Sequence, residues 1–253
     1  MLWHKAWVDT RWRFFIGLAL LLVLACGSSL TFPKVRDFLA SIELPAVGDE
    51  EATAAFAQSL DIVRTFRGYA WSQWFSQNFP MLLTIMAALL GSGSSLVKGG
   101  SGALFSLALP VSRSRWIGTR AGTAYAELLV LALAPSVAFA VLAPLVGEQF
   151  AAAEAIVYGL CAFVGGSLFV GLAVFLSTLF NDVWRPFLLT CFAALAIAIA
   201  GGSLPGDHGL FQAMGGKNYF FEGTVAWPEL LVSAAAAVGF VHAAAARLAR
   251  RDF

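Results

Sequence analysis

Six stretches of the sequence are apolar over the length that crosses a lipid bilayer as a helix. About 20 apolar residues span the roughly 30 Å hydrocarbon core of a membrane. We expect membrane-spanning helices at residues 14–30, 79–97, 117–146, 155–180, 186–201 and 229–246. Only 12% of the residues are charged, against about 25% in soluble domains. The sequence therefore predicts an all-α integral membrane protein that forms a single transmembrane domain.

The segments between these spans have distinct compositions. Residues 1–13 carry Trp3, Trp7 and Trp12 among charges, which is typical of an amphipathic helix lying at the membrane interface. A signal peptide is the alternative for this basic start and the apolar run after it; we favour a retained first span. Residues 31–78 and 202–228 are expected to form external loops, and residues 98–116 and 247–253 a cytoplasmic loop and tail. We expect a kink or break of the third span near Pro135 or Pro144.

The positions of the basic residues predict the orientation of the chain. Most of the 16 Lys and Arg residues fall in residues 1–13, 98–120, 181–185 and 247–253. With six spans these four segments share one side of the membrane. Because cytoplasmic segments carry the excess of Lys and Arg, both termini are expected in the cytoplasm.

No segment has the pattern of a catalytic or metal site. His4, His208 and His242 lack the spacing of metal ligands, and the three cysteines lie within apolar runs, where packing is the simplest interpretation. The glycine-rich residues 91–102 fail the phosphate-loop pattern. We therefore expect no catalytic residue, metal or cofactor in this chain, so that any ATP must be bound by a separate subunit. The net charge of +1 gives no indication of a nucleic-acid partner.

One acidic residue falls well inside a predicted span. Glu127 lies in the third span, and Arg120 lies seven residues earlier on much the same helix face. A carboxylate at that depth costs about 2.5–3.5 kcal/mol on insertion scales, so it is a functional candidate. The structural alternative is a hydrogen bond from Glu127 to a neighbouring helix or a buried water.

The loop after the second span combines apolar and basic residues. Residues Gly102–Arg115 read GALFSLALPVSRSR. We expect Leu104, Phe105, Leu107, Ala108 and Leu109 to form a short apolar helix that ends at Pro110. Arg113 and Arg115 follow it. A helix this short cannot cross the membrane, so we expect it to lie along the interface or to dock in a groove of a partner protein.

These motifs together resemble the ABC-2 type permeases, the membrane subunits of ATP-driven exporters in the bacterial cytoplasmic membrane. The resemblance is carried by the amphipathic start, the large loop after the first span, the L-x-L-P-V-S-R element at Leu107–Arg113 and the final ARRDF. It implies that the loop helix couples to the ATPase. The implied contact residues are Leu104, Phe105, Leu107, Pro110, Arg113 and Arg115. The chain departs from many family members at Val97–Gly102, which lacks the acidic residue and Gly-Thr that often precede this helix.

The resemblance also implies the partners and the mechanism. Two copies of an ATPase subunit, which hold ATP and Mg²⁺, would drive two permease subunits, either identical or siblings, with the substrate path between them. The second and fifth spans would line that path, giving Thr84, Met86, Phe187 and Phe192 as candidates. Two other functions stay open at this point. One is an ion-coupled secondary carrier that uses Glu127, and the other is a membrane assembly subunit that transports nothing.

Overall fold

The computed structural model describes residues 2–41, 60–93, 113–180, 182–203 and 209–250, and all the regular structure in these ranges is helical. Five helices are long and apolar enough to cross a membrane. They are Leu2–Leu39, Ser114–Val146, Ala152–Ser177, Trp184–Ser203 and Trp227–Ala249. The chain is thus an all-helical, multi-pass membrane protein, with five such helices in the described ranges where the sequence predicts six.

Helix α1 (Leu2–Ala40) is continuous, so it joins the expected interfacial segment to the first span and runs past the expected boundary at Leu30. Pro33 lies inside it without ending it. Hydroxyl groups bind backbone carbonyls just before this proline, from Thr31 to Gly27 at 2.6 Å and from Tyr69 to Ser28 at 3.2 Å. One face of α1 is buried at helical spacing, through Thr10, Phe14, Gly17, Leu21, Ala25, Ser29 and Phe32.

Residues 60–64 are helical, and three short elements follow them. They are α3 (Phe66–Ala70), the π-helix η1 (Trp71–Phe75) and α4 (Asn78–Gly91). Part of the expected external loop is therefore helical. At 14 residues, α4 is shorter than a bilayer span. The rest of the predicted second span, residues 94–97, lies outside the described residues, so the sixth crossing stays a prediction.

Helix α6 (Arg113–Leu142) corresponds to the third predicted span and continues without a break through Pro135. The break comes later, where the 3₁₀-helix η3 (Ala143–Val146) has Pro144 in its first turn. The chain then turns at Gly147, whose φ of 76° lies in the left-handed region that glycine adopts most readily.

Helix α7 (Ala152–Ser177) is the centre of the bundle and packs against α4, α6 and α11 (Trp227–Ala249). Glycines permit this close packing: a Cβ on Gly171 would lie 2.7 Å from the carbonyl oxygen of Ala237 in α11. Close backbone approach at small residues is typical of membrane helices. Of the most apolar 18 residues of α7, 67% are buried by protein, so most of this helix does not face lipid.

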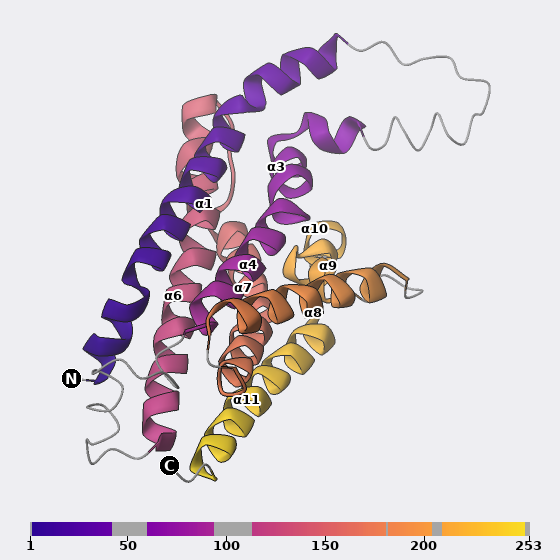
Figure 1. Ribbon diagram of the computed structural model, residues 1–253. Helices are drawn as coiled ribbons and strands as arrows, with labels where there is room; N and C mark the ends of the chain where they lie inside the picture. Colours follow the sequence, from indigo (N-terminus) through magenta and orange to yellow (C-terminus); the bar gives the residue numbers. More distant parts are fainter. Residues whose placement is uncertain (1, 42–59, 94–112, 181, 204–208, 251–253) are drawn as a thin grey trace.

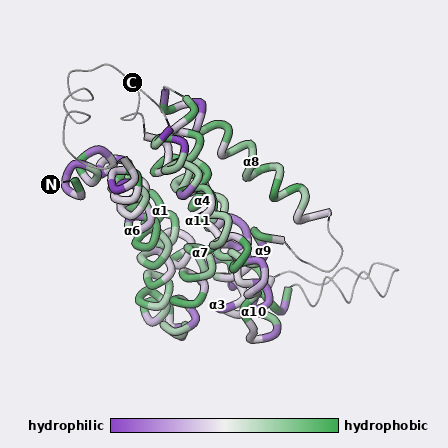
Figure 2. The backbone as a smooth tube through the Cα atoms, turned by 90° about the horizontal axis from the view of Figure 1, so that it is seen from below, coloured by the Kyte–Doolittle hydropathy of each residue, from purple (hydrophilic) through white to green (hydrophobic). Residues whose placement is uncertain are grey.

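Helix α8 (Trp184–Ser203) is the opposite case, with only 17% of its most apolar window buried. Figures 1 and 2 show it running at a steep angle to α7 and α11. Two short helices follow, α9 (Leu210–Met214) and α10 (Lys217–Glu222), within the second expected external loop.

Three helix ends lie together at one end of the bundle (Figure 1). The start of α1, the start of α6 and the end of α11 lie at this end, which we call the N-terminal end (Figure 1). Figure 2 shows hydrophobic residues along the helix bodies and hydrophilic residues at the start of α1 and around α3 and α10.

Candidate functional site

A polar contact joins α1 to α6 inside the bundle. Glu127 is 3% exposed, and its Oε1 accepts a hydrogen bond from the hydroxyl of Thr10, which is 7% exposed. The other carboxyl oxygen of Glu127 has no hydrogen-bond partner within the described ranges. The structure thus contains the interhelical hydrogen bond that the structural interpretation of Glu127 predicts.

A cavity of about 200 Å³ opens beside this contact, between α1, α6 and the end of α4. We call it the α1–α6 cavity. Its lining residues include Lys5, Asp9, Arg13, Gly93, Trp116 and Arg120. Three of these side chains are basic and one is acidic, so the lining has a surplus of positive charge.

Two arginines fix the geometry of the α1–α6 cavity. Nη1 of Arg13 donates hydrogen bonds to the carbonyl oxygens of Leu89, at 3.1 Å, and Ser92, at 2.8 Å. A cation there also interacts favourably with the negative end of the α4 dipole. The Arg120 guanidinium lies directly against Gly93, where any Cβ would overlap it. Arg120 of α6 is also attracted by the charge of Asp9 and repelled by that of Arg13, both in α1.

Most of the expected ATPase-contact residues lie outside the residues that the structure describes. Leu104, Phe105, Leu107 and Pro110 lie in residues 94–112, which are not among the described residues. Arg113 begins α6, and Arg115 is exposed on its first turn.

The candidates for the substrate path are divided between two helices. Thr84 is buried in α4, and a Cβ on Gly17 of α1 would come within 2.7 Å of the Met86 sulfur. Phe187 packs beside Trp184 at the start of α8, whereas Phe192 is 67% exposed on that helix. Helices α4 and α8, which carry these four candidates, contact each other.

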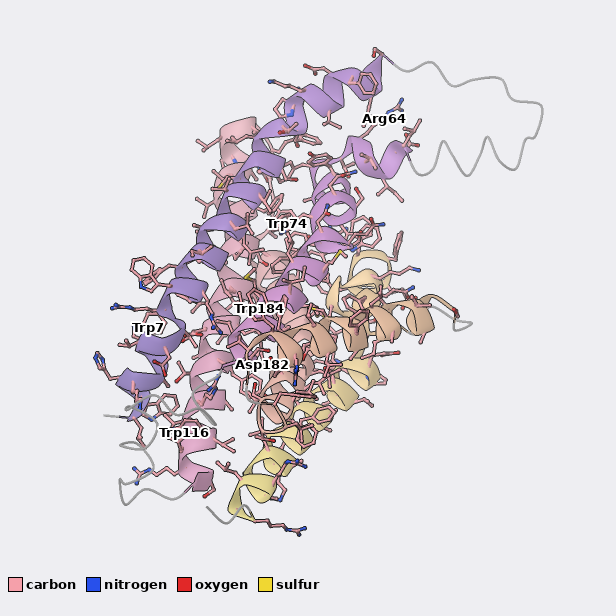
Figure 3. All side chains as sticks on the ribbon, in the orientation of Figure 1. Trp7, Arg64, Trp74, Trp116, Asp182 and Trp184 are labelled. Carbon is pink, nitrogen blue, oxygen red and sulfur yellow. The ribbon has the colours of Figure 1, made fainter. Side chains whose placement is uncertain are left out.

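Aromatic side chains pack closely together toward the opposite end of the bundle. Phe75 of η1 is 1% exposed and stacks on Tyr158 with a centroid distance of 4.6 Å. We call Phe75 and its ring neighbours the aromatic cluster; the neighbours are Phe79, Phe139, Phe150 and Tyr158. Figure 3 shows Trp7 and Trp116 toward the N-terminal end, Arg64 at the far end and Trp74 between them.

Several residues of the α1–α6 cavity were not expected from the sequence. Thr10 and Arg13 belong to the segment expected to lie at the interface, and Gly93 to the second span. A usable signal existed for α1: Ala6, Thr10 and Arg13 are small or polar residues at i, i+4 and i+7, which places them on one helix face. No comparable pattern marked Gly93, because its role depends on Arg120 from a different helix.

The contacts that the structure shows in this region are hydrogen bonds and charge interactions. No group of three His, Cys, Asp or Glu side chains suited to a metal ion occurs in the part of the chain that the structure describes. Comparisons with protein-family models, curated proteins and solved structures find no match to this chain.

Proposed function

We propose that the chain is the permease subunit of an ATP-binding cassette exporter in the bacterial cytoplasmic membrane. Six crossings with both termini in the cytoplasm belong to this proposal, as do two ATPase partners that hold ATP and Mg²⁺. The observation that carries it is the Leu107–Arg113 element between α4 and α6. The proposal assigns this element to the contact with the ATPase.

The packing around α1 supports a mechanical role for that element. Both helices that flank residues 94–112 are bonded to α1, through Arg13 to the end of α4 and through Thr10 to Glu127 of α6. A movement imposed between α4 and α6 would therefore reach the first helix directly. ATP drives such a change only by stabilising one arrangement of the helices more than the other.

The run from Phe66 to Gly91 supports the sixth crossing. Helices α3, η1 and α4 follow one another closely over this range. At about 1.5 Å per residue, a helix of this length reaches roughly 39 Å, more than the hydrocarbon core requires. With that crossing included, the chain has the even number of spans that places both termini on one side.

The exposed face of α8 supports pairing with a second permease subunit. Phe192 and Ile199 are 67% and 62% exposed, on a helix that is apolar enough to span a membrane. In the proposed transporter, the substrate path runs between the two subunits. Thr84, Met86, Phe187 and Phe192 are the candidates to line it.

The decisive experiment is co-purification with the ATPase. We expect the wild-type chain to retain an ATPase subunit in mild detergent and Phe105→Asp to lose it, because an acidic side chain would disrupt apolar docking. Phe38→Asp is the control, since Phe38 is an exposed phenylalanine in the last turns of α1, away from the N-terminal end. Normal co-purification of Phe105→Asp would contradict the docking role. Absence of any ATPase from the wild-type preparation would contradict the proposed function.

A further inference from the structure

The α1–α6 cavity has the charge and the size of a site for a small anion. Lys5, Arg13 and Arg120 contribute three positive charges, and Asp9 contributes one negative charge. Glu127 lies next to it, hydrogen-bonded to Thr10 of the cavity wall. The volume of about 200 Å³ is several times the roughly 30 Å³ that one water occupies in the liquid. A tetrahedral oxyanion with hydrogen-bonded water fits such a space.

Tryptophans place this cavity at the level of lipid headgroups. Trp116 is part of its lining, and the Trp3 ring lies against Gly122 of α6, where a Cβ would come within 2.7 Å. Trp7 lies at the same end of the bundle (Figure 3). Indole side chains concentrate at the membrane–water interface, so the phosphates of lipids lie at the height of the basic side chains.

We propose that the α1–α6 cavity binds a phosphate group, either on an anionic membrane lipid or as a free anion. Planar guanidinium groups match the oxygens of phosphate, and basic pockets between membrane helices bind phosphate-bearing headgroups. Arg120 and Lys5 provide the ligand contacts, and Arg13 adds positive charge from a position fixed by two carbonyl groups. This site is independent of the proposed exporter function.

Gly93 and Asp9 shape the site without supplying its charge. Gly93 leaves the room that the Arg120 guanidinium occupies. Asp9 is exposed and attracts Arg120 electrostatically, which holds the arginine toward α1. The lining keeps its positive surplus with Asp9 ionised, because three basic side chains remain against it.

The test measures lipid bound to the purified full-length chain by intact-protein mass spectrometry in an uncharged detergent. Phosphatidylglycerol is compared with diacylglycerol, which has the same chains but no phosphate. We expect retention of phosphatidylglycerol only. Lys5→Gln and Arg120→Gln should each weaken its binding about fivefold, the factor that one basic residue contributes near an anionic membrane surface. Lys5 is exposed, so its substitution tests the site even if the Arg120 variant fails to fold.

Arg11→Gln is the matched control, since it removes the same charge from the same helix outside the cavity. Its affinity should stay within about twofold of wild type. Inorganic phosphate added as a competitor distinguishes the sources: displacement of the lipid indicates a free-anion site, and retention indicates a headgroup site. Equal binding of both lipids, or equal losses in all three variants, would overturn the proposal.

Discussion

The two ends of the helix bundle are stabilised by different kinds of interaction. Around Phe75, the aromatic cluster fills its space with stacked and edge-on rings. At the N-terminal end, the α1–α6 cavity has charged side chains around open volume. One end is therefore stabilised by close packing of aromatic rings, whereas the α1–α6 cavity at the other end is lined by charged and hydrogen-bonded side chains.

This difference predicts that the N-terminal end changes its contacts more easily than the end with the aromatic cluster. Interdigitated rings allow little movement without a loss of packing, because protein interiors have few voids. A polar cavity exchanges water, ligand and hydrogen-bond partners at much lower cost. The N-terminal end is also the one at which the Leu107–Arg113 element joins the bundle in the proposed transporter.

Truncation of Phe75 is the strongest test of the closed end. Phe75→Ala should lower the free energy of unfolding by about 3 kcal/mol, because a buried ring leaves a cavity that its neighbours cannot fill. The measurement is unfolding by SDS in mixed micelles. Phe38→Ala is the control, since Phe38 is 66% exposed and should change stability by less than about 0.5 kcal/mol. Similar losses for both variants would mean that the aromatic cluster is not a packed unit.

An ion pair at the margin of this end provides a smaller test. Arg67 donates to Glu154 at 2.9 Å and lies over the Phe220 ring, 5.0 Å from its centroid. Arg67→Ala should cost about 1 kcal/mol, since both interactions are partly exposed. The loss, measured in the same way, should shrink at high salt.

Arg64→Ala supplies the comparison for that variant. Arg64 pairs locally with Asp61, at 3.2 Å, and both side chains are well exposed. Its loss should stay below about 0.5 kcal/mol. A cost for Arg64→Ala equal to that for Arg67→Ala would show that the pair with Glu154 adds nothing beyond local charge.

The sequence predicted the helices better than the contacts between them. Apolar length located α7, α8 and α11 within a few residues, because the bilayer alone sets that length. It missed the extension of α1 through Pro33, whose neighbouring carbonyls are bonded partly by Tyr69 from a distant part of the chain. The sequence identifies Glu127 as a charge within a span, but it does not identify Thr10 as its hydrogen-bond partner. That pairing depends on how α1 packs against α6, which no local pattern encodes.

The smallest expected effect concerns the hydrogen bond that joins α1 to α6. Thr10→Val keeps the shape of the side chain but removes the hydroxyl that binds Glu127. Interhelical hydrogen bonds in membranes average about 0.6 kcal/mol, so we expect a loss of that size on SDS unfolding. Thr119→Val is the matched control, because the hydroxyl of Thr119 bonds within its own helix, to Arg115. A clear loss for Thr10→Val and none for Thr119→Val would show that this end depends on hydrogen bonds between helices. Equal losses of stability in both variants would mean that the hydrogen bond to Glu127 does not specifically stabilise the contact between α1 and α6. The contrast between the two ends would then depend on the cavity charges alone.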